Sequence, residues 1–234
     1  SVEWNGEWYD SSGTYYYNNN NLNSYSLNFD GIDDFNTISS NPSFDNLDDF
    51  SFMFWILPND IVNRQELLSK DIDPQPNGDW SSFIYNNKFT FELRHGNSSN
   101  YSITSNTLIS DSSWTNVVIT RNSSSGEIKL YINGLFDNSS FSTTGPILNT
   151  KDIHIGRHAV LNSFFYDGLF DELSIWSIIL DSINIQELIT CSPNGIEYGL
   201  LGYWNFEEGS GNTAYDQSSN GNNIPIHGAT YNID

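Results

Sequence analysis

The chain has 234 residues, with 8 Lys and Arg against 29 Asp and Glu, and therefore a net charge of −21 at pH 7. This balance argues against nucleic acid and anionic membrane surfaces as partners, because clustered Lys and Arg side chains bind both. Hydrophobic residues make up 37% of the sequence, so the chain can bury a core, which argues against disorder along its whole length. We expect a single domain, since an all-β sandwich of about 200–250 residues commonly forms one unit.

Neither a disulfide nor a membrane span is expected in this chain. The single cysteine, Cys191, has no second cysteine to pair with, so hydrophobic packing or a bound metal must stabilise the fold. No apolar run approaches the ~20 residues of a membrane span. The sequence begins at Ser1 without the basic stretch and apolar core of a signal peptide. We therefore expect a mature or excised piece whose export signal lies outside it.

Apolar residues alternate with polar ones, or form short runs, between clusters of Gly, Asn, Ser and Asp, which is typical of sandwich strands. The run at 50–57 is apolar on nearly every residue and predicts a strand buried on both faces. Asn133-Gly134 predicts a tight hairpin turn. One helix is expected over residues 182–190, with Asp181 as its N-cap. In chain order, the expected strands are residues 24–29, 34–38, 50–57, 80–85, 88–93, 101–105, 114–121, 127–133, 153–155, 169–176, 198–206 and 225–231.

More than ten short strands with one helix predict two packed antiparallel sheets. Four parts of the sequence also resemble laminin G-like domains of the concanavalin A-like lectin/glucanase superfamily. They are SLNFDGIDDF (26–35), the pair WTNVVIT (114–120) and IKLYING (128–134), YDGLFDELSIW (166–176), and the pair GYWNFEEGSG (202–211) and YDQSSNGNN (215–223). The resemblance covers most of residues 24–231.

The resemblance implies an all-β jelly-roll sandwich of two antiparallel sheets with one short helix. We expect residues 1–234 to form a single domain of this type, with 1–23 as an N-terminal strand-and-loop extension. The Trp-rich segment at 202–223 comes last here, whereas it is often seen at the beginning of such domains. We therefore expect residues 198–231 to return beside the strand of Phe29 and to close the same sandwich.

Calcium is the expected cofactor. A hard cation needs six to eight oxygen ligands, and it would relieve the repulsion among gathered carboxylates in so acidic a chain. Relatives of this fold hold calcium in such loops, and the resemblance implies that Asp171 and Asp216 are ligands, with Asp30 and Asn222 beside them. The alternative is that Asp30 and Asp216 cap their own turns. A second oxygen-rich loop at 71–79 is another place for calcium.

A sugar ligand is expected to stack on an aromatic ring while amides, carboxylates and Arg side chains bind its hydroxyl groups. Several residues of these kinds fall on the middle strands or at their ends. The alternative for each aromatic residue is a place in the core or in a cross-strand pair. The candidate ligand-binding residues are Trp80, Tyr85, Arg94, His95, Tyr101 and Arg157.

The jelly-roll glucanases carry a Glu-x-Asp-x-x-Glu strand, which holds the two carboxyl groups of retaining hydrolysis. No Glu of this chain has Asp two residues later, and there is no Gly-x-Ser-x-Gly elbow. We therefore predict a non-catalytic, calcium-stabilised adhesion or carbohydrate-binding module of a larger secreted or cell-surface protein, with an extracellular glycan or glycoprotein as partner. The alternatives are a divergent glycan-active hydrolase or lyase and a purely structural spacer.

Overall fold

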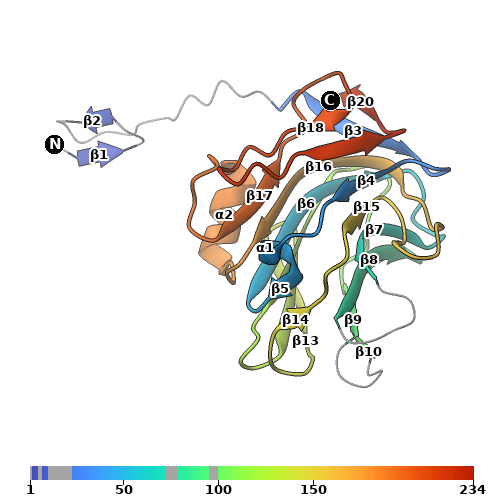
Figure 1. Ribbon diagram of the computed structural model, residues 1–234, viewed down its shortest axis with the longest axis horizontal. Coiled ribbons are helices and arrows are strands. Elements are labelled where there is room, and N and C mark those ends of the chain that lie inside the picture. Colours follow the sequence, from blue (N-terminus) through green and yellow to red (C-terminus); the bar gives the residue numbers. More distant parts are fainter. Residues whose placement is uncertain (1, 5–6, 10–22, 72–77, 95–99) are drawn as a thin grey trace.

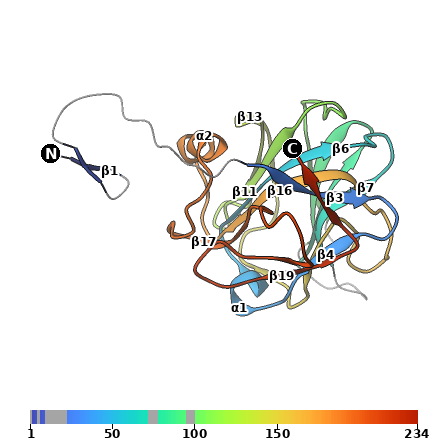
Figure 2. The same cartoon turned by 90° about the horizontal axis from the view of Figure 1, so that it is seen from above.

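The computed structural model describes residues 2–4, 7–9, 23–71, 78–94 and 100–234. Two antiparallel eight-stranded sheets, here named sheet I and sheet II, pack around a common core (Figures 1 and 2). The predicted all-β, two-sheet sandwich is therefore confirmed. Sheet I contains, in spatial order, β10 (Asn100–Thr104), β9 (Lys88–Arg94), β8 (Asp79–Tyr85), β7 (Gln65–Lys70), β15 (Ile153–Ile155), β4 (Phe35–Ile38), β19 (Ile224–His227) and β18 (Thr213–Ala214).

Sheet II contains, in spatial order, β13 (Leu135–Phe141), β12 (Glu127–Ile132), β11 (Thr115–Arg121), β6 (Phe50–Pro58), β16 (Asp167–Trp176), β3 (Tyr25–Asp30) and β20 (Thr230–Ile233), and β17 (Leu200–Trp204) pairs with β16. The remaining elements are the hairpin of β1 (Val2–Trp4) and β2 (Glu7–Tyr9), the pair of β5 (Asn46–Leu47) and β14 (Ile147–Leu148), and the helices α1 (Pro42–Asp45) and α2 (Ser182–Thr190).

Sheet II is covered on both faces. Phe52 and Phe54 of β6 point into the core between the sheets, where the Phe54 ring stacks on Phe170 with centroids 5.2 Å apart. Between them Met53 points the opposite way and packs in a second cluster with Ile185 of α2. This confirms the prediction that residues 50–57 are buried on both faces. Helix α2 thus covers the part of the outer face of sheet II around Met53.

Helix α2 has the bounds that the sequence predicts. The Asp181 carboxylate accepts hydrogen bonds from the backbone N–H groups of Ile183 and Asn184, which have no partner inside the helix. The Asn184 side chain in turn accepts from the backbone N–H of Asp181, so the two ends of a capping box are complete.

The last strands of the chain join both sheets. In sheet I, β19 pairs with β4, so that Ile226 lies opposite Asn36. In sheet II, β20 pairs with β3, so that Tyr231 lies opposite Leu27. The Trp204 ring is fully buried and its indole N–H donates to the backbone oxygen of Asn222, 2.9 Å away. Segments from the two ends of the sequence therefore share one core.

The strands β5, β7, β13, β14 and β18 were not expected from the sequence, and β19 and β20 were expected as one strand at 225–231; β7 and β13 are the longest of the unexpected strands. β7 has a register shift between Glu66 and Leu68, so its apolar residues do not alternate, and it buries the charged side chains of Glu66 and Lys70. β13 is an edge strand with a polar Asn-Ser-Ser stretch, and most of its residues are exposed or half-buried. Irregular alternation and buried charge conceal β7, whereas a polar and largely exposed sequence conceals β13.

Candidate functional site

The outer face of sheet I carries the polar side chains of three neighbouring strands. On β8, Trp80 and Ile84 point into the core, so Asp79 and Ser81 on either side of Trp80 point outward. Ser81 lies opposite Glu92 of β9 in the ladder. Strand alternation therefore places these hydroxyl and carboxyl groups together on one side of the sheet.

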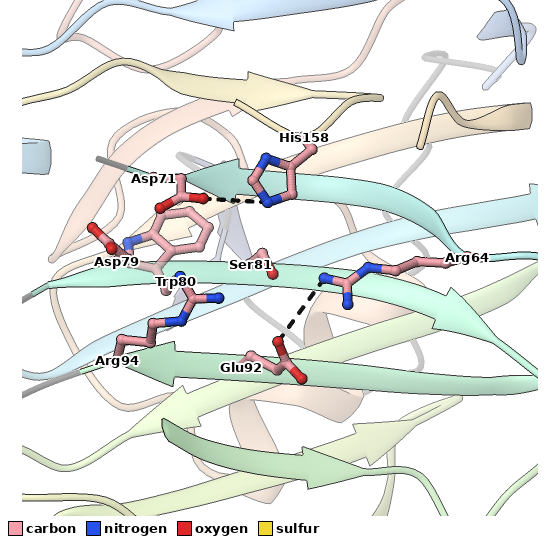
Figure 3. Close-up of a pocket in the computed structure, with 8 residues that line it drawn as sticks. All are labelled: Arg64, Asp71, Asp79, Trp80, Ser81, Glu92, Arg94 and His158. Carbon is pink, nitrogen blue, oxygen red and sulfur yellow. Dashed lines mark ion pairs between the residues drawn. The ribbon is translucent and has the colours of Figure 1, made fainter. Parts of the chain in front are cut away.

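A small pocket lies on this face (Figure 3). Its side chains come from both ends of β7, from β8 and β9, and from the connection after β15. The space between them has a volume of about 20 Å³, which admits one water-sized group. The pocket is lined by Arg64, Asp71, Asp79, Trp80, Ser81, Glu92, Arg94 and His158.

Arg64 holds one end of the pocket. Its Nε and Nη2 groups donate to Glu66 Oε1 over 3.0 and 2.7 Å, and Nη2 lies 3.9 Å from Glu92 Oε2. The guanidinium carbon lies 3.7 Å from the centre of the Phe83 ring, which is a cation–π contact. Because Arg64 is fixed by two carboxylates and a ring, it is presented in one orientation, as Figure 3 shows for the pair with Glu92.

Glu66 is a fully buried carboxyl group beneath this face. Burial raises the pKa of Glu66 to about 7, although the ion pair with Arg64 acts in the opposite direction. Its Oε2 atom is buried and has no hydrogen-bond partner among the described residues. Glu66 therefore positions Arg64 from below and is not itself exposed to a ligand.

His158 closes the other end of the pocket. Its Nε2 atom lies 3.2 Å from Asp71 Oδ2 (Figure 3). Burial lowers the pKa of His158, and the nearby charge of Asp71 opposes this shift only in part. His158 is therefore neutral at pH 7. In the pocket, Arg64 and Arg94 then supply hydrogen-bond donors, and the carboxylates of Asp71, Asp79 and Glu92 supply acceptors. Such an alternation suits hydroxyl groups, which donate and accept at once.

Of the six predicted ligand residues, Trp80 and Arg94 line the pocket. Trp80 does not offer its ring to a ligand, because the side chain is 2% exposed and its ring centre lies 4.8 Å from that of Phe52 in the core. This corrects the expectation of an exposed Trp80 ring: position 80 faces inward on β8. Arg94 is half-buried at the end of β9. Of the six predicted ligand residues, it is therefore the one whose polar side-chain group can contact a ligand in this pocket.

The other four predicted ligand residues are not brought together. Tyr85 is exposed at the far end of β8, and Tyr101 is half-buried on β10 opposite Leu93. Arg157 lies over the Phe35 ring, 3.6 Å from its centre, outside the pocket. His95 lies outside the described residues.

The four predicted calcium ligands do not form one site. Asp171 is buried in β16 and accepts from Asn23 Nδ2 over 2.7 Å. Asp216 accepts from three backbone N–H groups, those of Tyr203, Ser218 and Asn222. This is the turn-capping role that was the alternative for Asp216. Since these oxygen atoms already accept hydrogen bonds at separate places, the four residues do not fit one shared ion.

Asp30 belongs to a different group. Its carboxylate lies with those of Asp33 and Asp34 in the turn between β3 and β4, with the ligand atoms within 4.8 Å of one another. Asp30 Oδ1 also accepts from the backbone N–H of Ile32, as the alternative reading for this residue predicts. Burial raises the pKa of Asp34, and the charges of Asp30 and Asp33 add to the shift. Carboxylate oxygens are ligands that Ca²⁺ prefers. Calcium binding by Asp30 stays a prediction, and the structure places Asp33 and Asp34, which were not predicted ligands, beside it.

Four residues that line this pocket are not among the predicted ligand residues, namely Arg64, Ser81, Glu92 and His158. Asp71 and Asp79 belong to the oxygen-rich loop at 71–79 that was a second candidate for calcium, and residues 72–77 of that loop lie outside the described residues. Glu92 alternates with core residues in β9 and could have been placed on the outer face by its register with Arg94. Arg64 and Asp71 flank a strand that was not expected, and His158 follows a three-residue strand. No signal in the sequence joins these three residues.

The fold and the pocket together define the class: a lectin-type sandwich of two antiparallel sheets with a polar pocket on the open face of one sheet. Residues 29–186, more than half of the chain, match a laminin G-type family model described as the concanavalin A-like lectin/glucanases superfamily. The chain belongs to this superfamily, as the resembling segments predict. No curated protein sequence matches it significantly.

Solved structures share this fold at low sequence identity. A candidate carbohydrate-binding protein from Bacteroides ovatus superposes with a TM-score of 0.72 at 15% identity, over 90% of this chain and 60% of that one. The SAP-like pentraxin of Limulus polyphemus gives 0.65 at 15% identity, over 91% of this chain and 96% of that one. The CBM40 of the Ruminococcus gnavus IT-sialidase, bound to α2,3-sialyllactose, gives 0.55 at 14% identity, over 72% of this chain and 98% of that one.

This chain thus spans about 60% of the length of the Bacteroides ovatus protein. Within the described ranges, no helix is long and apolar enough to cross a membrane.

Proposed function

We propose that this chain is a non-catalytic carbohydrate-binding module that holds a glycan on the outer face of sheet I. The observation that carries the proposal is the pocket in Figure 3, where Arg and carboxylate side chains alternate on the open face of a lectin-type sheet. Membership of a superfamily that includes lectins supports the same conclusion.

The pocket suits one part of a sugar at a time. Its volume of about 20 Å³ accepts a hydroxyl or similar small group, not a whole ring. Arg64 and Arg94 can donate to such a group while Glu92 accepts from it. The fixed orientation of Arg64 lowers the entropy that is lost on binding.

The first test is a glycan array with the wild-type chain and two variants. Arg94→Ala removes a donor from the pocket, and we expect roughly tenfold weaker binding or more, as for the loss of a hydrogen bond to a charged group. Lys129→Ala is the matched control, because Lys129 lies on β12 of sheet II and pairs only with Glu127 among the described residues. We expect the control to bind like wild type.

A wild-type chain that binds no glycan on the array would contradict the proposal and favour a structural spacer. Equal binding by wild type and Arg94→Ala would move the site away from this pocket. Reproducible release of reducing ends from a polysaccharide would overturn the non-catalytic assignment and favour a hydrolase.

The proposal includes a place in a larger secreted or cell-surface protein, where the module attaches its parent to an extracellular glycan or glycoprotein. The strongly acidic surface and the likeness to lectin and laminin-type domains support this context. The length of the Bacteroides ovatus relative, of which this chain spans 60%, is consistent with further domains in the parent.

Calcium stabilisation is also part of the proposal, at the acidic turn of Asp30, Asp33 and Asp34. A ligand that binds only the folded state at ~100-fold above its Kd stabilises it by about 2.7 kcal/mol, or roughly 5–10 °C for a chain of this size. We expect calcium to raise the Tm by roughly 5–10 °C and EDTA to reverse this rise. The exposed Asp33 can be changed to Asn, which should abolish the calcium effect; an unchanged Tm in wild type would contradict calcium binding.

A further inference from the structure

We infer that the loops at one end of the sandwich form a second subsite, which takes a neutral pyranose ring and stacks it on Phe164. The inference rests on the proposed glycan-binding function and names a ligand class and a site for it. None of the six residues predicted to bind a sugar lines the subsite, although Asp30, a predicted calcium ligand, does. The subsite shares Arg64 with the pocket of Figure 3.

The subsite is a cavity of about 470 Å³. This volume is within the range of about 300–1,000 Å³ that is usual for small-molecule sites, so it admits a whole sugar ring. Three loops line this cavity: the turn between β3 and β4, the loop between β6 and β7, and the loop between β15 and β16. They lie at the right-hand side of Figure 1. The lining residues are Asp30, Gly31, Asp60, Asn63, Arg64, Gln65, Asn162, Ser163, Phe164, Phe165 and Asp167.

Phe164 supplies the apolar surface. Its side chain is 39% exposed, and its backbone has φ = 57°, which is costly for an aromatic residue. The surrounding structure holds this conformation: the Phe164 carbonyl accepts from the backbone N–H of Glu66 over 2.8 Å. The preceding loop is fixed as well, since Arg157 Nη1 donates to Asn162 Oδ1 over 2.7 Å. The ring is therefore presented to solvent by a rigid loop, as a stacking surface should be.

The polar groups around the ring suit hydroxyl groups. Asp167 and Asp30 lie directly opposite each other where β16 pairs with β3. Asp167 Oδ1 accepts from Asn59 Nδ2 over 2.8 Å, while Asp167 Oδ2 makes no hydrogen bond within the described part of the chain. Amide side chains of Asn63 and Asn162 add donors and acceptors to the same cavity. This is the combination of planar polar groups and an aromatic ring that a pyranose requires.

The charge of the cavity selects against acidic sugars. The carboxylates of Asp60 and Asp167 face one cation, Arg64, and Asp30 adds a third carboxylate when no calcium is bound at its turn. Side-chain and backbone hydrogen bonds from Asn63 lower the pKa of Asp60 in spite of its partial burial, so Asp60 remains ionised at neutral pH. In a chain with a net charge of −21, a sialylated, uronic or sulfated sugar would meet further repulsion. The ligand class is therefore a neutral hexopyranose.

Arg64 connects the two sites. Its guanidinium carbon lies 3.7 Å from the Phe83 ring centre on the sheet and 5.3 Å from the Phe164 ring centre in the loop. The same side chain pairs with Glu66 beneath the pocket of Figure 3. A glycan of more than one residue can therefore place one ring on Phe164 and a hydroxyl group of the next in the small pocket.

The test is isothermal titration of the full chain with neutral oligosaccharides and with sialylated and uronic counterparts, chosen from the glycan array. We expect wild type to prefer the neutral ligands and Phe164→Ala to bind them roughly tenfold more weakly, because a stacking surface is lost. Phe141→Ala is the matched control: Phe141 is 62% exposed on β13 and lies outside the cavity. Asp167→Asn keeps the acceptor for Asn59 but removes a charge, and should reduce the discrimination against acidic ligands.

Hydrogen exchange gives a readout that does not depend on a variant. A saturating neutral ligand should protect backbone amides at 162–165 in the wild-type chain. Equal affinity of wild type and Phe164→Ala together with no protection would overturn the subsite while leaving the proposed function in place, provided that Arg94→Ala still weakens binding. Preference for acidic glycans would overturn the ligand class. Failure of wild type to bind any glycan would remove the proposed function, and the subsite with it.

Discussion

Lowering the pH from about 8 to about 5 is expected to stabilise this protein. Burial, aided by the adjacent charge of Glu172, raises the pKa of Asp171 to about 9, and burial raises the pKa of Glu66 to about 7. In the unfolded chain both carboxyl groups ionise near pH 4. At these two groups the folded state binds more protons between about pH 5 and pH 8, so their contribution to the free energy of unfolding falls as the pH rises. Burial lowers the pKa of His154 and of His158, which opposes this trend in part below about pH 6.5.

Asp171 should contribute most of this dependence. Its side chain is 2% exposed, and between pH 5 and 8 it should account for a loss on the order of 2–4 kcal/mol. Asp171→Asn keeps an acceptor for the backbone N–H of Glu172, and the Asn23 amide can rotate to match the new side chain. Urea unfolding at pH 5, 6.5 and 8 should show a shallower pH dependence for this variant.

The control is Asp111→Asn, which removes the same charge from an exposed position and should leave the pH dependence unchanged. An identical pH dependence of stability in wild type and Asp171→Asn would show that Asp171 is ionised in the folded state. A buried anion at that position would then need a cation close to it.

Replacing Phe170 by alanine is expected to cause the largest loss of stability. Its ring lies 5.2 Å from the ring of Phe54 and 6.4 Å from the rings of Phe29, Tyr166 and Phe206, centre to centre. Removing a buried aromatic side chain costs about 3–5 kcal/mol, because the cavity collapses only in part. For a chain of this length the Tm should fall by about 10 °C or more.

Thermal unfolding followed by circular dichroism measures this effect. Phe141→Ala serves as the control, because an exposed side chain on the edge strand β13 should change stability by less than about 0.5 kcal/mol. A small effect of Phe170→Ala would mean that the neighbouring rings move to fill the space, and that the core between the two sheets is less tightly packed than the ring distances indicate.

Local sequence patterns predicted much of the fold. Alternation placed Phe89 and Phe91 of β9 in the core, and the acidic N-cap at Asp181 gave the start of α2. These features depend on near neighbours in the chain, which the sequence displays directly. The burial of Lys70 depends on a residue far away in the chain, Asp45, whose carboxylate pairs with Lys70. Glu66 pairs with Arg64 only two residues away, but its burial follows from the packing of β7 inside sheet I.

The predicted metal ligands failed to gather for the same physical reason. Asp171 follows Phe170, which points into the core, so ordinary alternation turns the Asp171 side chain to the other face of β16, where Asn23 donates to it. Asp216 instead accepts from the backbone N–H groups of Tyr203, Ser218 and Asn222, so the place of each carboxylate depends on tertiary contacts. Likewise, the loop that presents Phe164 is fixed by bonds to β7, so the exposure of that ring follows from tertiary contacts.

The pairing of β20 with β3 has a mechanical consequence. The two strands are antiparallel, and the last bond of their ladder joins the backbone N–H of Asp234 to the carbonyl of Ser24, 3.0 Å away. A pulling force applied between Ser24 and Asp234 would therefore break the backbone hydrogen bonds of this ladder one after another. It would not load all of them at once in shear. Under tension between these two points, the edge strand β20 of sheet II would separate first, at low force, while the strands of sheet I that line the pocket of Figure 3 stayed intact.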